Sequence, residues 1–109
     1  MEFKTLQGHK QAQAWAYRND RGEWGLMSYN TKIIIVKGSR VLATGTYSRT
    51  TIKHIGWFLR EYLPDLSYQD IKTLIMKNQA WNFDKGPEPL TDEEKRIIKQ
   101  ERKTVSYIG

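Results

Sequence analysis

The chain has 109 residues, with 18 Lys and Arg against 12 Asp and Glu, so its formal net charge is +6. This length predicts a single domain, residues 1–109, without room for separate cofactor and substrate domains. The absence of cysteine excludes disulfides, thiolate catalysis and cysteine-based zinc sites. No apolar run approaches the roughly 20 residues of a membrane-spanning helix. We therefore expect a cytoplasmic protein that makes no membrane contact.

Residues 12–47 predict a four-stranded antiparallel β-meander. The first segment alternates small and aromatic residues, as a half-buried strand does, and a turn sequence rich in Asn, Asp and Gly follows it. Four consecutive β-branched apolar residues later in this region favour a strand that is covered on both faces. The expected strands are 14–17, 23–29, 32–36 and 41–46.

Residues 48–79 predict two packed α-helices. Ser48 or Thr50 can cap the first helix, whose apolar side chains recur at helical spacing until Pro64 ends it. Ser67 and Asp70 have the spacing of a capping box, which marks the start of the second helix.

Residues 80–90 contain Gly and Pro and predict a loop, and residues 91–109 predict a third helix with a tail. Thr91 and Glu94 form the capping-box pattern at its start. Two adjacent isoleucines are the only apolar residues inside this helix, so we expect it to be peripheral. The fold class that follows is α+β: a four-stranded meander, two packed helices and a peripheral C-terminal helix.

The positive charge is concentrated in the first three-quarters of the chain. Residues 1–47 carry seven basic and three acidic side chains, residues 48–80 carry five and three, and residues 81–109 carry six of each. A basic field favours an acidic partner, such as nucleic acid or an acidic protein surface. A net charge of about this size is also typical of a small domain that needs charge only for solubility.

The first predicted helix places cations and one large aromatic residue on one side. Phosphates pair with cations, and a tryptophan stacks on a base or fills a partner's pocket. The alternative interpretation is a solvated helix face with a tryptophan that packs onto the core. The candidate contact residues are Arg49, Lys53, Trp57 and Arg60, and Lys32, Lys37 and Arg40 would extend the basic field.

The second predicted helix offers an alternative site. The two helices and their short link have the pattern of a helix-turn-helix, whose second helix reads the major groove of DNA. The residues that it would present are Gln69, Lys72, Thr73 and Lys77.

Catalytic signals are sparse. Asp65, Asp70 and Lys72 resemble the two carboxylates and lysine of metal-dependent nucleases, but that chemistry needs carboxylates that converge on one ion. The two histidines, His9 and His54, have no metal-ligand partners nearby in sequence. We interpret His54 as a partly buried imidazole hydrogen-bonded to the sheet. No enzyme activity, cofactor or metal is expected, and the nuclease stays a remote alternative.

One sequence pattern carries a resemblance. Residues 27–31, Met-Ser-Tyr-Asn-Thr, precede residues 47–55, Tyr-Ser-Arg-Thr-Thr-Ile-Lys-His-Ile, and then Phe58 and Leu59. This combination, over about residues 27–59, resembles small bacteriophage- or prophage-encoded proteins of uncharacterised function. The resemblance implies a phage accessory protein that acts in the cytoplasm of a bacterial host.

The hypothesis from the sequence is a small, non-enzymatic binding protein of phage type. It would occlude nucleic acid or a host protein that handles nucleic acid, as anti-defence or anti-CRISPR inhibitors do. The alternative from the second helix is a DNA-binding regulator.

Overall fold

The computed structural model of the chain describes residues 1–45 and 48–106. Within these ranges the backbone forms seven strands and three helices. Their order and bounds are β1 (Glu2–Thr5), β2 (Ala14–Arg18), β3 (Trp24–Ser28), β4 (Thr31–Lys37), β5 (Arg40–Ala43), α1 (Arg49–Tyr62), α2 (Tyr68–Lys77), β6 (Gln79–Asn82), β7 (Gly86–Pro89) and α3 (Asp92–Ser106).

All the strands belong to one antiparallel sheet, in which the spatial order follows the chain order from β1 to β7. The expected four-strand sheet is therefore wrong, although β2 to β5 lie where the four strands were predicted. The expected loop at 80–90 contains the β6–β7 hairpin. Strand β7 was missed because it contains Pro87 and Pro89, and proline is unfavourable inside a sheet. The strand can form because β7 lies at the sheet edge, where proline is tolerated. Every residue of β1 is exposed, so no hydrophobic alternation marks it.

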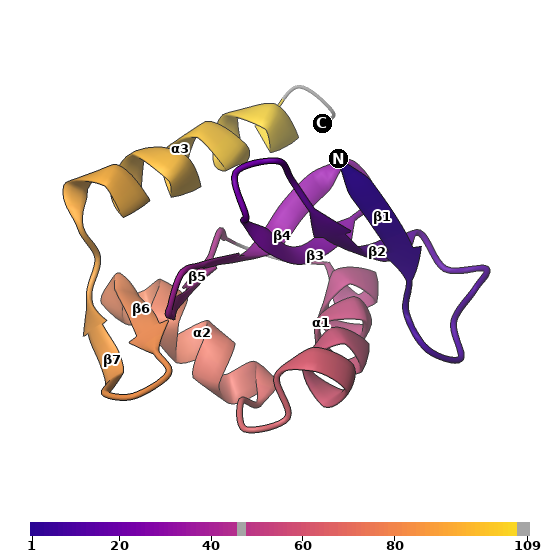
Figure 1. The fold of residues 1–109 in the computed structure, drawn as a ribbon, viewed down its shortest axis with the longest axis horizontal. Coiled ribbons are helices and arrows are strands. Elements are labelled where there is room, and N and C mark those ends of the chain that lie inside the picture. The colour runs from indigo at the N-terminus through magenta and orange to yellow at the C-terminus, as the bar shows by residue number, and fades with distance from the viewer. Residues whose placement is uncertain (46–47, 107–109) are drawn as a thin grey trace.

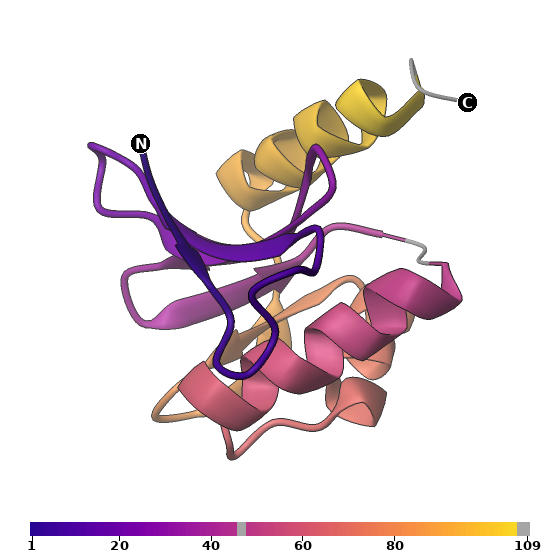
Figure 2. The same ribbon diagram turned by 90° about the vertical axis from the view of Figure 1, so that its right-hand side faces the viewer.

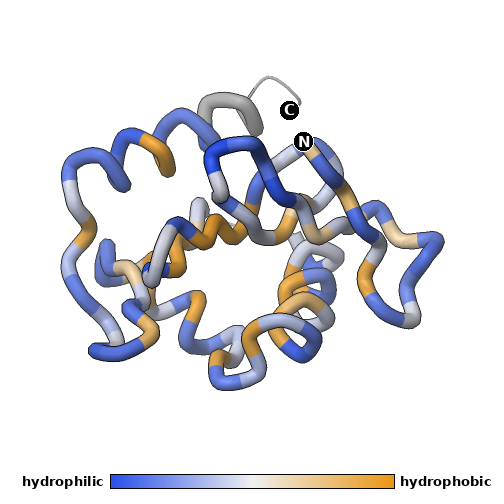
Figure 3. Tube along the Cα trace, in the orientation of Figure 1, coloured by the Kyte–Doolittle hydropathy of each residue, from blue (hydrophilic) through white to orange (hydrophobic). Residues whose placement is uncertain are grey.

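The sheet is the middle layer of a three-layer arrangement. Helices α1 and α2 cover one face and α3 covers the other, as Figures 1 and 2 show from two directions. Strand β4 therefore has helices on both sides: Ile34 packs in the core with α1 and α2, and Ile35 packs in the core with α3. This confirms the prediction of a strand covered on both faces. Figure 3 shows hydrophobic residues both on the central strands and on the helices that pack against them.

The predicted helix starts are confirmed by their capping hydrogen bonds. The Ser48 hydroxyl accepts from the Thr51 backbone N–H at the start of α1. Ser67 and Asp70 form a reciprocal capping box at the start of α2. The Thr91 hydroxyl accepts from the Glu94 N–H before α3, and the Glu94 carboxylate accepts from the Thr91 N–H.

Helix α3 is not peripheral, which corrects the sequence expectation. Ile98 is only 5% exposed and packs with Ile35 and Leu42 on the sheet. Its acidic side chains form ion pairs with basic residues of β4 and β5. Two isoleucines are enough to dock the helix because these ion pairs hold the rest of it against the sheet. The sequence did not predict this docking, because ion pairs between distant segments leave no local pattern. The predicted tail of the segment 91–109 is shorter than expected, because α3 runs to Ser106, and residues 107–109 lie outside the described residues.

Candidate nucleic-acid interface

Three of the predicted contact residues lie together on the outer side of α1. Arg49, Lys53 and Arg60 are exposed, and the helical period places them along one line. Within the described part of the chain none of the three forms an ion pair. Gly56 lies on the same line, and an added side-chain carbon there would meet no atom within 4 Å. We call these four residues the α1 face; it presents three unpaired cations around a position with no side chain.

Trp57 lies beside this face but is engaged within the protein. Its ring stacks on His9, with the ring centroids 3.5 Å apart and the planes at 9°. The second neighbour is His54, whose ring centroid is 5.4 Å away. Trp57 is half-buried, so it fixes the β1–β2 loop against α1 in place of standing free for a partner. No sequence pattern indicated the role of His9, because a stacking contact between distant segments follows no spacing rule.

A chain of hydrogen bonds joins the start of α1 to the sheet. The Ser48 hydroxyl lies 3.2 Å from that of Thr51, which lies 3.1 Å from the hydroxyl of Ser28 on β3. The Ser28 hydroxyl also lies 2.8 Å from Nδ1 of His54. The prediction that His54 is hydrogen-bonded to the sheet is confirmed, and the ring is almost fully buried at 2% exposure. Burial lowers the pKa of His54, and the charge of His9 lowers it further.

These contacts give a physical role to the sequence pattern within residues 27–59. Ser28, Thr51 and His54 all belong to that pattern, and they anchor α1 on β3. Tyr29 also belongs to it, and its ring lies 5.8 Å from the His54 ring. The pattern thus supplies the residues that attach α1 to β3, and the α1 face lies on this anchored helix.

The sheet cations Lys32, Lys37 and Arg40 are already paired with acidic residues. Lys32 lies 3.8 Å from Glu101, and Lys37 is paired with Glu93. The interaction with Lys37 lowers the pKa of Glu93. These pairs all involve α3, so they neutralise the part of the basic field that these residues were expected to supply.

Arg40 is the most heavily engaged of these cations. Its Nε donates to Glu94 at 2.7 Å and its Nη1 donates to Glu88 at 2.6 Å. Its Nη2 donates to the Glu94 carboxylate at 2.9 Å and to the Pro89 carbonyl at 2.8 Å. The hydrogen bond to Glu94 is the main cause of a raised Arg40 pKa. Burial opposes ionisation of Glu94, yet the hydrogen bonds from Arg40 and Thr91 hold its pKa below the ordinary value.

The outer side of α2 carries the alternative DNA-reading residues. Gln69, Lys72, Thr73 and Lys77 are all exposed, and the neighbouring Met76 is 73% exposed. The Thr73 hydroxyl donates to the Gln69 carbonyl at 2.9 Å, so it is turned back onto its own helix.

The three residues of the nuclease alternative have different structural settings. Asp65 is exposed in the turn between α1 and α2, whereas the Asp70 carboxylate accepts from the N–H and hydroxyl of Ser67. Lys72 is exposed on α2. Across the part of the chain that the structure describes, no group of three His, Cys, Asp or Glu residues is arranged to hold a metal ion.

The fold and site together define an α+β protein with a helix–sheet–helix layering and a cationic helix face. The chain belongs to a family of unknown function, DUF8033, whose model matches residues 2–78, from β1 through α2. No curated protein and no solved structure matches it. Among the helices of the described residues, none has the length and apolar character needed to span a membrane.

Proposed function

We propose that this protein is a small, non-enzymatic binding protein of phage type that engages an acidic partner through the α1 face. The partner is nucleic acid, or the acidic surface of a host protein that handles nucleic acid, and binding occludes it. The observation that carries the proposal is the contrast between the cations of α1 and those of the sheet. Arg40 and its neighbours on β4 are neutralised within the fold, whereas Arg49, Lys53 and Arg60 have no ion-pair partner among the described residues.

The geometry suits a phosphate backbone. Three cations along one helix line can follow a row of phosphates, and the missing side chain at Gly56 allows a close approach. The helix itself is firmly held, because Ile55, Phe58 and Leu59 are buried on its inner side. A rigid helix loses little conformational freedom on binding, which favours affinity.

The test compares two triple variants with the same loss of charge. In the first, Arg49, Lys53 and Arg60 are all changed to Gln; in the control, the exposed Lys95, Arg96 and Lys99 of α3 are changed to Gln. Binding to fluorescein-labelled single-stranded DNA, duplex DNA and RNA is followed by fluorescence anisotropy. The α1 variant is expected to bind about tenfold more weakly or worse, and the control to bind nearly as the wild type does. Equal losses in both variants would show that net charge alone acts.

The protein partner is tested separately. If the wild type binds no nucleic acid at micromolar concentration, capture from bacterial lysate after nuclease treatment is compared for the wild type and the α1 variant. An acidic protein held by the wild type and the α3 control but lost by the α1 variant supports the protein arm. Capture that is the same for all three chains, with no nucleic-acid binding, overturns the proposal.

The alternative function, a DNA-binding regulator, rests on the exposed outer side of α2. It predicts a preference for one duplex sequence over others, which Lys72→Gln with Lys77→Gln would remove. The α1 proposal predicts that this α2 variant binds as the wild type does, without sequence preference.

A further inference from the structure

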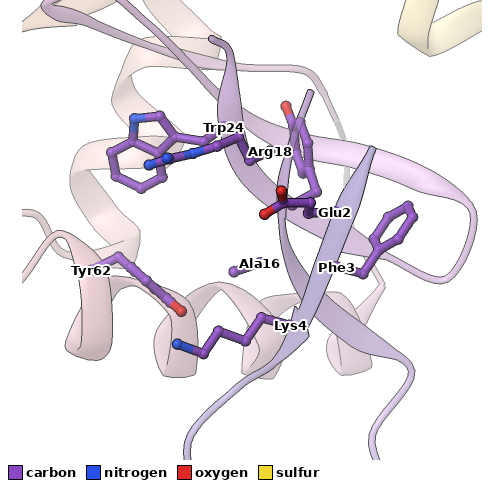
Figure 4. A pocket seen from close by; sticks show the side chains of 8 residues that line it. Glu2, Phe3, Lys4, Ala16, Arg18, Trp24 and Tyr62 are labelled. Atoms are coloured by element: carbon purple, nitrogen blue, oxygen red, sulfur yellow. The ribbon is translucent and has the colours of Figure 1, made fainter. Parts of the chain in front are cut away.

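A cavity of about 480 Å³ opens between the exposed edge of the sheet and the end of α1. A volume of this size is typical of small-molecule sites. Figure 4 shows its lining side chains around the small residue at its floor. The residues that matter for the argument are Glu2, Lys4, Ala16, Arg18, Trp24 and Tyr62.

The cavity exists because small and large residues alternate along the sheet edge. Ala16 on β2 faces the helix side and is paired with Lys4 on β1. Its methyl group leaves a hollow beneath the flexible Lys4 side chain. Phe3, the residue between Glu2 and Lys4, points to the other side of β1 (Figure 4), so it does not fill the hollow.

Two aromatic rings form one wall of the cavity. Trp24 on β3 and Tyr62 on α1 have ring centroids 6.1 Å apart and planes at 55°. Both residues are half-buried: each packs against Phe58 on one side and lines the cavity. Because the two planes are inclined, a flat ligand can stack on one ring while its edge meets the other.

Three charged residues line the cavity: Glu2, Lys4 and Arg18. Glu2 is directly opposite Arg18 in the β1–β2 register, and Lys4 follows on the same face. In the part of the chain that the structure describes, none of these three forms an ion pair, although Lys32, Lys37 and Arg40 on the same sheet all do. The cavity therefore offers two cations and one carboxylate beside an aromatic wall.

We propose that this cavity binds a nucleotide. The base stacks on Trp24 or Tyr62, the phosphate pairs with Lys4 and Arg18, and Glu2 accepts hydrogen bonds from an amino group of the base. The nucleotide is either a free mononucleotide or one unit of a single strand. The inference does not depend on the α1 face, so either proposal can fail without the other.

The test uses isotope-labelled full-length protein and follows the indole N–H signal of Trp24 by NMR during titration. The probes are guanosine monophosphate, guanosine, inorganic phosphate and a short single-stranded DNA. Guanosine monophosphate is expected to shift the Trp24 signal, with little change at Trp81, and to bind more tightly than guanosine or phosphate alone. A shift with single-stranded DNA but not with the mononucleotide identifies the polymer as the source.

The variants make the result specific. Lys4→Gln with Arg18→Gln is expected to weaken binding by about tenfold or more, since two charge-assisted contacts are lost. Lys10→Gln is the control, because Lys10 is exposed in the neighbouring loop and does not line the cavity. Ala16→Leu fills the hollow and is expected to abolish binding. If this substitution disturbs the fold, the double variant of the exposed Lys4 and Arg18 still tests whether the cavity binds the nucleotide.

Two results overturn the inference. One is a Trp24 signal that moves with neither the mononucleotide nor the single strand at millimolar concentration. The other is binding that the Lys4 and Arg18 variant retains in full. A loss of single-strand binding in the α1 triple variant, with mononucleotide binding retained, would separate this site from the α1 face.

Discussion

Arg40 on β5 and Glu94 on α3 form a two-point ion pair that fastens the third helix to the sheet. Both nitrogen–oxygen contacts are short, at 2.7 and 2.9 Å, and Glu94 is only 6% exposed. The same carboxylate accepts from the Thr91 backbone N–H at the helix start. One acidic residue thus caps α3 and docks it.

Removing Arg40 should therefore destabilise the fold. Arg40→Ala leaves the buried Glu94 charge without its main partner, so we expect a loss of about 3 kcal/mol in the free energy of unfolding. Urea denaturation measures it. Lys37→Ala is the control: its pair with Glu93 is more exposed to solvent, so its loss should destabilise the fold much less. Equal losses for the two variants would show that the Arg40 pair does not dock α3.

Two glycines should respond in opposite ways to replacement by alanine. A side-chain carbon on Gly25 would overlap the Ile34 backbone carbonyl on the neighbouring strand, so Gly25→Ala should severely destabilise or unfold the protein. Gly56 has open space and lies inside α1, so Gly56→Ala should raise stability by about 0.5–1 kcal/mol. Thermal denaturation of both variants checks this. A Gly25→Ala variant as stable as the wild type would contradict the close approach of β3 and β4.

His54 should make the fold sensitive to acid. In the unfolded chain its imidazole titrates near its ordinary pKa of about 6.5, whereas burial lowers the folded pKa below that value. The unfolded state therefore takes up the proton first as the pH falls. The stability from neutral His54 is complete above about pH 6.5 and is lost as the pH falls through the folded pKa. The free energy of unfolding should decrease from about pH 7 to pH 5, and less steeply in His54→Gln.

The His9–Trp57 stack should hold the loop between β1 and β2. His9→Ala removes an aromatic pair, so we expect a loss of about 1 kcal/mol and faster hydrogen exchange in residues 6–13. The neighbouring Lys10→Ala variant should leave both unchanged. Exchange in this loop that is the same in all three proteins would show that the stack does not restrain it.

Local signals predicted much of this fold. The capping pairs Ser67 with Asp70 and Thr91 with Glu94 lie within one helical turn, so the sequence displays them directly. The hairpin β6–β7 was missed because the glycine and prolines of β7 are typical of loops and because both strands are short. The docking of α3 was missed because Arg40 and Glu94 are far apart in the chain.

The sequence likewise predicted only part of the candidate surface correctly. Helical spacing alone places Arg49, Lys53 and Arg60 together, and the structure leaves them exposed. Charge counting over blocks of sequence suggested that Lys32 and Lys37 would add to the field, but acidic residues of α3 form ion pairs with both. Block counts cannot show this, because neutralisation depends on which segments meet in space.

The salt dependence of nucleic-acid binding tests the central claim most directly. Each phosphate contact on duplex DNA contributes roughly 0.9 to the slope of log affinity against log salt concentration. If Arg49, Lys53 and Arg60 each neutralise one phosphate, changing all three to Gln should reduce the slope by about 2.7. The matched triple variant of Lys95, Arg96 and Lys99 should keep the wild-type slope. The same slope for all three proteins would contradict the role of α1.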